Sequence, residues 1–211
     1  MSWRSALFLV WVTGCALPAN EAPPAAPRAT TTRLIPPRLS EAERRDIAQG
    51  LLVKKKTVLF RNGKKYVGGL SFQLVNATPA VVLQEIFSTE AALSWMPQTL
   101  SARAVGGGGR DLMVRFEQGE KPFVATHTLH IWRDDLAIRW KLDPRQHHDI
   151  EDAWGFLSAT PFGEGRSLVT LGIQLDLGDG LVRAFAEADI QDTVLGTPRD
   201  IKDYVETRHP G

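Results

Sequence analysis

The sequence contains very little cysteine: Cys15 is the single one among 211 residues. One cysteine excludes an intramolecular disulfide, so the fold has to be stabilised by its core. The chain also lacks a Gly-x-Ser-x-Gly element, a His-Glu-x-x-His element and a phosphate-binding loop ending in Lys-Ser or Lys-Thr. These absences argue against several common classes of hydrolase, metalloprotease and nucleotide-binding protein.

An excess of charge of one sign is missing as well. The formal net charge is +1, and residues 1–14 contribute one Arg and no acidic residue, so the rest of the chain is formally neutral. A nucleic-acid-binding protein would carry a basic excess, and we therefore expect no nucleic-acid partner. His127 and His130 are three residues apart and would point to opposite faces of a strand. His147 and His148 could bind a transition metal weakly, but a solvated loop is the better interpretation, and we expect neither metal nor cofactor.

Long hydrophobic runs are absent, and the longest near the start covers only residues 6–12. Such a run is too short to span a bilayer, which takes about 20 residues, but it suits the core of a signal peptide. The next residues, Val12-Thr13-Gly14-Cys15, resemble a bacterial lipobox. This resemblance implies cleavage before Cys15 and attachment of lipid to its thiol. The alternatives are an exported protein cut near Ala19 and a cytosolic protein.

We therefore predict three parts in the chain. Residues 1–14 form a signal peptide, and residues 15–39 form a tether that carries the lipidated cysteine. Six of the thirteen prolines lie in residues 16–39, which favours a disordered or polyproline-like segment. Residues 40–211 suit one domain. The predicted location is the cell envelope, where the lipid anchor would hold the protein to a bacterial membrane facing the periplasm or the exterior.

The residue patterns of the domain predict mainly strands, with helices at both ends and two short helices after the first strand pair. Ser40 and Glu43 fit a helix capping box, and Asn62-Gly63 predicts a tight hairpin between two strands. Thr78-Pro79 and Ser88 open two short helices. Period-two patterns predict further strands near residues 99–105, 110–117, 122–133, 135–143, 151–160 and 166–177. The connections are short, which indicates antiparallel neighbours. Helical patterns follow over residues 181–190 and again from Pro198.

Several segments together resemble the START/Bet v 1-like (SRPBCC, polyketide cyclase-like) helix-grip superfamily. The segments that carry the likeness are Val75–Val82, Leu93-Ser94-Trp95-Met96-Pro97, Asp152–Phe156, Pro161–Thr170 and Pro198–Val205. The resemblance implies an α+β fold in which a curved antiparallel sheet wraps a C-terminal helix, with two short helices after the first strands. Gly196-Thr197-Pro198 departs from the single unbroken helix of that family.

Families of this fold bind lipids, sterols, polyketides or other apolar molecules, and some members are cyclases or aromatases. We predict a non-enzymatic, monomeric domain that holds a lipid or other apolar small molecule between helix and sheet. The alternatives are a cyclase- or hydrolase-like enzyme and a protein-interaction module with a collapsed cavity. Large aromatic side chains commonly line apolar pockets, and His127 is the polar candidate among them. The predicted lining residues are Trp95, His127, Trp140, Trp154, Phe156 and Phe185.

The lysines of the first predicted hairpin allow two interpretations. Lys54-Lys55-Lys56 and Lys64-Lys65 would lie close together across the predicted hairpin and form a basic patch. Such a patch could contact anionic lipid headgroups. A solvated edge strand protected by lysines is the favoured interpretation.

Overall fold

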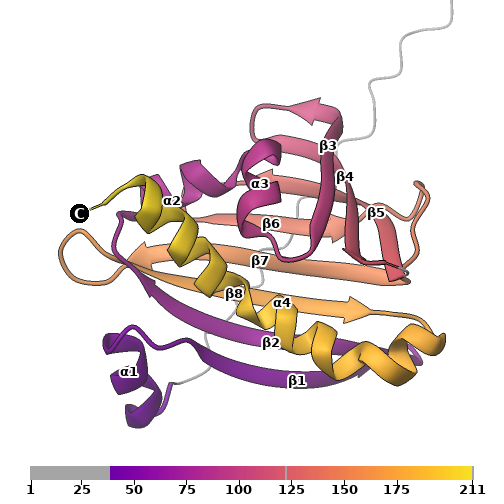
Figure 1. Ribbon diagram of the computed structural model, residues 1–211, viewed down its shortest axis with the longest axis horizontal. Coiled ribbons are helices and arrows are strands. Elements are labelled where there is room, and N and C mark those ends of the chain that lie inside the picture. The colour runs from indigo at the N-terminus through magenta and orange to yellow at the C-terminus, as the bar shows by residue number, and fades with distance from the viewer. Residues whose placement is uncertain (1–38, 122, 211) are drawn as a thin grey trace, which may run out of the picture. The chain divides into compact units, whose positions relative to one another are not determined.

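The protein is described by a computed structural model over residues 39–121 and 123–210, with the backbone alone at 123 and 181–185. The eight strands form one antiparallel sheet in the order β1-β2-β8-β7-β6-β5-β4-β3 (Figure 1). The elements are α1 (Glu41–Ala48), β1 (Val53–Arg61), β2 (Lys64–Val75), α2 (Pro79–Ile86), α3 (Thr89–Trp95), β3 (Thr99–Gly108), β4 (Asp111–Glu120), β5 (Phe123–Arg133), β6 (Ala137–Leu142), β7 (Asp152–Pro161), β8 (Ser167–Asp176) and α4 (Leu181–Arg208).

The predicted fold class is confirmed: the domain is α+β, with a curved antiparallel sheet, a C-terminal helix and two short helices after the first strands. The predictions for the signal peptide, Cys15 and most of the tether lie outside the described residues. In the described part of the chain, no helix is both long enough and apolar enough to cross a membrane.

Local sequence signals explain where the first elements begin and turn. Ser40 caps α1, because the Glu43 amide donates to its Oγ at 3.2 Å while the Ser40 amide donates to Glu43 Oε2 at 2.7 Å. Asn62 and Gly63 turn the β1–β2 hairpin with φ angles of 51° and 75°. Both positions need the left-handed region that Asn and Gly tolerate, as the sequence predicts. Ser88 caps α3 by accepting from the Ala91 amide at 3.2 Å.

The sheet has two differently covered faces, and strand alternation assigns each side chain to one of them. We call inner the face whose side chains form the main core with α2, α3 and α4. We call outer the opposite face, where α1 packs through Ile47 on Val53, Phe72 and Leu74. Inner-face core residues of the two central strands, packed together with Ile201 and Val205 of α4, are Ala153, Leu157, Ala159, Val169, Leu171 and Leu175.

The C-terminal helix α4 is continuous for 28 residues and contains Pro198 in its interior. The prediction of an interruption at this proline is therefore wrong. An interior proline costs about 3 kcal/mol, because its ring nitrogen cannot donate to the carbonyl four residues earlier. Leu195, Ile201 and Val205 are fully buried on either side of it. Each such side chain contributes about 1.5–3 kcal/mol, so tertiary packing outweighs the local penalty.

A polar contact fixes the middle of α4 over the sheet. Gln191 is buried, and its Nε2 donates to the carbonyl oxygens of Thr57 at 3.0 Å and Gly68 at 2.7 Å. Its amide therefore joins the helix to both β1 and β2. This contact sets the helix above the first strands, and α3 lies beside the far edge strand β3 (Figure 1).

Candidate functional site

The inner face of β4 and β5 carries a histidine packed among apolar side chains. His127 is opposite Phe116 in the register of the two strands, and their rings stack with centroids 5.7 Å apart at 23°. His127 is only 6% exposed. The next inner positions on the same two strands are Val114 and Leu129, both buried. The predicted polar candidate therefore lies on the face that α3 and α4 cover.

Burial governs the charge of this histidine. Removal from water lowers the pKa of His127 to about 4, and the nearby Asp149 carboxylate opposes that shift only in part. The ring is therefore neutral at pH 7. Its Nδ1 has no hydrogen-bond partner among the described residues. An unpaired buried polar atom costs about 1–3 kcal/mol, which makes this position unusual in a folded core.

Trp95 presents a second buried polar atom of the same kind. It ends α3, is 8% exposed and belongs to the same core cluster as Phe116 and Leu129. Its indole Nε1 likewise has no acceptor among the residues that the structure describes. An indole N–H can only donate. We call His127, Phe116 and Trp95 the inner polar site.

Trp140 also lies on the inner face, one strand further along the sheet. It is opposite Ile131 on β5 and Gly155 on β7. A Cβ added at Gly155 would overlap the Trp140 ring, so the missing side chain makes room for the indole. Trp140 packs against the main core cluster. Of the predicted lining residues, the structure thus brings Trp95, His127 and Trp140 to the inner face.

Trp154 and Phe156 are on the outer face, away from this set. They alternate on β7 with the buried inner residues Ala153 and Leu157. The Phe156 ring covers the space in which a Cβ on Gly172 would lie. Neither residue lines the space under α4. The side chain of Phe185 and the whole of Cys15 lie outside the described residues.

The outer face carries a hollow that the sequence analysis does not predict. It has a volume of about 480 Å³ and spans strands β1, β2, β7 and β6. Its lining consists of Arg61, Asn62, Lys64, Tyr66, Lys141, Asp152 and Trp154. The alternation of Trp154 with Ala153 and Leu157 is the one sequence signal that could have placed an aromatic residue there.

The remaining polar candidates have local partners. His130 is on the outer face, and its Nε2 lies 2.7 Å from Asp111 Oδ1. His148 Nδ1 is 2.8 Å from the Ile150 carbonyl oxygen. In the described ranges, no three His, Cys, Asp or Glu side chains are grouped to hold a metal ion.

The lysines of the first hairpin form ion pairs within the domain. The two on the inner side of β1, Lys54 and Lys56, both pair with Asp192 of α4 at 3.0 Å. Lys55 on the other side pairs with Glu43 of α1 at 3.0 Å. Lys65 contacts Glu187 at 2.6 Å. These lysines connect β1 and β2 to the helices on both faces.

No protein-family model matches the sequence, and no curated protein is significantly similar to it. Solved structures do share the fold. A STAR-related lipid transfer protein from Xanthomonas axonopodis is similar with a TM-score of 0.58 and 13% identity, over 72% of this chain and 98% of that one. The Zhui aromatase/cyclase from Streptomyces sp. R1128 is similar with a TM-score of 0.57 and 13% identity, over 75% of this chain and 96% of that one. Human StAR-related lipid transfer protein 5 has a TM-score of 0.54 and 9% identity, over 73% of this chain and 88% of that one. At such low identities the likeness establishes the helix-grip fold that START and aromatase/cyclase domains share.

Proposed function

We propose that the domain binds a hydrophobic small molecule with an uncharged polar group, held against the inner face of the sheet beneath α3 and α4. The observation that carries this proposal is that two buried polar atoms of the inner polar site, His127 Nδ1 and Trp95 Nε1, have no partners among the described residues; Ser71 Oγ on β2 is a further atom of this kind. Buried polar atoms in folded proteins are nearly always hydrogen-bonded. A ligand oxygen beside either atom would supply its missing partner.

The charge state of the site selects the class of ligand. His127 is neutral at pH 7, because burial holds its pKa near 4, and Trp95 offers only a donor. A hydroxyl, ketone or ester oxygen suits such groups. A carboxylate or phosphate would be buried here without a countercharge, at a cost of several kcal/mol. Long-chain or polycyclic alcohols and ketones therefore fit better than fatty acids or phospholipids.

A binding role fits this site better than catalysis does. A general acid or base works best when its pKa is near the working pH. A histidine with a pKa near 4 is a weak base at neutral pH and is almost never protonated. The similar structures include both lipid transfer proteins and an aromatase/cyclase. The chemistry of His127 favours the first of these roles, and an enzyme on a hydrophobic substrate is the second candidate.

The envelope location is part of the same proposal. Lipid on Cys15 would anchor the protein, and the Pro-rich tether of residues 15–39 would let the domain reach ligands near a membrane. Two or three acyl chains give stable anchoring, whereas a single chain gives only marginal binding. Incorporation of labelled palmitate into the full chain tests the anchor. We expect the label to be lost in Cys15→Ser, and labelling that survives this change would overturn the anchor without affecting the binding proposal.

Native mass spectrometry of the full chain after incubation with an envelope lipid extract tests the binding proposal. We expect one retained, uncharged lipid per chain, and at least tenfold lower occupancy in His127→Phe. His130→Gln is the matched control, because it changes a histidine on the same strand that lies on the outer face, and it should retain the wild-type occupancy. Retention of nothing, or of anionic phospholipids alone, would contradict the proposal.

A further inference from the structure

We propose that the outer hollow is a second binding site, for an elongated aromatic molecule with an anionic group at each end. The hollow is on the face of the sheet opposite the inner polar site, so the two sites are separated by the sheet itself. Its volume of about 480 Å³ is within the range of about 300–1,000 Å³ that small-molecule sites usually have.

The cations at the ends of the hollow differ from the other basic residues nearby. Lys54, Lys55 and Lys56 all pair with acidic residues at 3.0 Å. Arg61 and Lys141 have no carboxylate within 4 Å in the described part of the chain, although both line the hollow. Unpaired cations that face a shared concavity can bind anionic groups through charge-assisted hydrogen bonds.

The strand order separates these two cations. Arg61 is on β1 and Lys141 is on β6, four strand spacings away in the sheet. Four spacings of about 4.8 Å separate the two strands by roughly 19 Å. The register places Lys141 level with Thr57, so Arg61 lies four residues, or roughly 13 Å, further along β1. The two backbones are therefore roughly 23 Å apart, and side chains that reach about 5 Å toward each other leave roughly 13 Å between the charges. A single small anion cannot contact both cations, whereas a rigid molecule with two anionic groups can.

The residues between the cations favour an uncharged aromatic body. Trp154 is half-buried in the hollow, and aromatic rings stack favourably on indole. The Tyr66 hydroxyl donates to Asp152 Oδ2 at 3.0 Å, so the middle of the hollow holds a carboxylate. That carboxylate repels an anion at the centre and directs negative charge to the two ends. Lys64 also lines the hollow, but it lies 3.6 Å from Glu151 and 3.7 Å from Asp176, so the positive charge available at this end is that of Arg61.

Calorimetric titration of the full chain with three probes tests this site. The probes are 2,6-naphthalenedicarboxylate, 2-naphthoate and adipate. We expect the naphthalene dianion to bind with a Kd of about 1 mM or lower, and about tenfold more tightly than either 2-naphthoate, which lacks one charge, or adipate, which lacks the ring.

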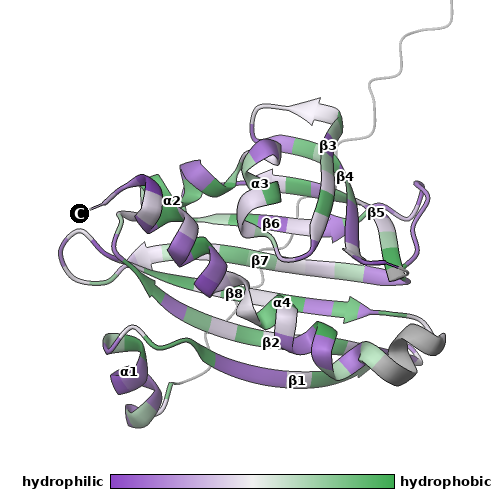
Figure 2. Cartoon of the chain, viewed as in Figure 1, coloured by the Kyte–Doolittle hydropathy of each residue, from purple (hydrophilic) through white to green (hydrophobic). Residues whose placement is uncertain are grey.

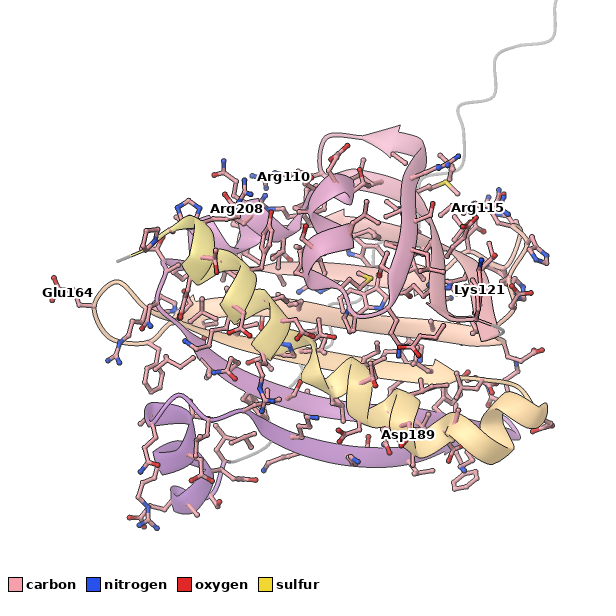
Figure 3. All side chains as sticks on the ribbon, in the orientation of Figure 1. Arg110, Arg115, Lys121, Glu164, Asp189 and Arg208 are labelled. Atoms are coloured by element: carbon pink, nitrogen blue, oxygen red, sulfur yellow. The ribbon has the colours of Figure 1, made fainter. Side chains whose placement is uncertain are left out.

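Three variants locate the binding. Arg61→Gln and Lys141→Gln should each weaken binding of the dianion by about 3- to 10-fold. The control is Arg115→Gln on the exposed surface of β4 (Figure 3), which removes one positive charge outside the hollow and should leave the affinity unchanged. An equal loss in Arg115→Gln, equal binding of adipate and the naphthalene dianion, or the absence of saturable binding would each overturn the proposal. His127→Phe should leave this affinity unchanged, so the test is independent of the inner polar site.

Discussion

Acid should destabilise this domain through His127 more strongly than through an exposed histidine. The pKa of this ring is about 4 in the folded protein, against 6.5 for an ordinary histidine. Because the unfolded chain binds a proton at a higher pH than the folded chain does, stability falls as the pH drops from about 6.5 to 4. Linkage over that interval gives a loss of about 3 kcal/mol at pH 4 and about 2 kcal/mol between pH 7 and pH 5. The contribution is fully present at pH 7 and above.

Urea unfolding of the wild type and of His127→Gln, each at pH 7 and pH 5, isolates this contribution. Glutamine does not titrate, so the variant should lose about 2 kcal/mol less than the wild type between the two pH values. Carboxylates titrate equally in both proteins and cancel in the comparison. His130→Gln, which changes the outer-face histidine of the same strand, should retain the full wild-type loss. Equal losses in wild type and His127→Gln would refute the argument that burial keeps this ring neutral.

Two further substitutions test how the inner face is built, and urea unfolding measures both. Gln191→Leu removes the hydrogen bonds that join α4 to the Thr57 and Gly68 carbonyls. We expect it to lower the free energy of unfolding by about 1–3 kcal/mol, with an unchanged circular dichroism spectrum. An unchanged urea midpoint would contradict this role of Gln191. Gly155→Ala forces a methyl group into the Trp140 ring and should cost about 1–3 kcal/mol, whereas Gly108→Ala, with open space around it, should change stability by less than about 0.5 kcal/mol.

Periodicity in the sequence predicts the strands well but does not say which face is inner. On β7 the inner residues Ala153 and Ala159 are small, while the outer residues Trp154 and Phe156 are large. Side-chain size therefore points to the wrong face on this strand. The inner position of Gly155 holds no side chain because the Trp140 ring of β6 occupies the space over it. This contact joins two strands, so the residue pattern of β7 alone cannot predict it.

For the C-terminal helix, the sequence predicts a break that the structure does not contain. Local propensity favours a break at Gly196-Thr197-Pro198, and the helix continues because Leu195, Ile201 and Val205 are buried in the core.

His127 illustrates how much of the candidate site the sequence could predict. Strand parity places it with Leu129 on one face, but its burial involves Phe116, which stacks on it from another strand.

The paired lysines of the first hairpin bear on how the domain would meet a membrane. The sequence suggests a basic patch, and Figure 2 shows the lysine run of β1 as a hydrophilic stretch. In the fold, however, Lys54 and Lys56 share the carboxylate of Asp192, Lys55 pairs with Glu43 and Lys65 with Glu187, so these four lysines and three carboxylates leave one net positive charge. A lysine that is already neutralised adds little attraction to anionic headgroups, which is worth about 1 kcal/mol for each free charge. Electrostatic attraction by this hairpin is therefore weak, and under the proposed anchoring the lipid on Cys15 would supply the attachment. It follows that Cys15→Ser should release the domain from membranes at physiological salt, whereas charge-reversing Lys54→Glu should affect folding stability more than membrane association.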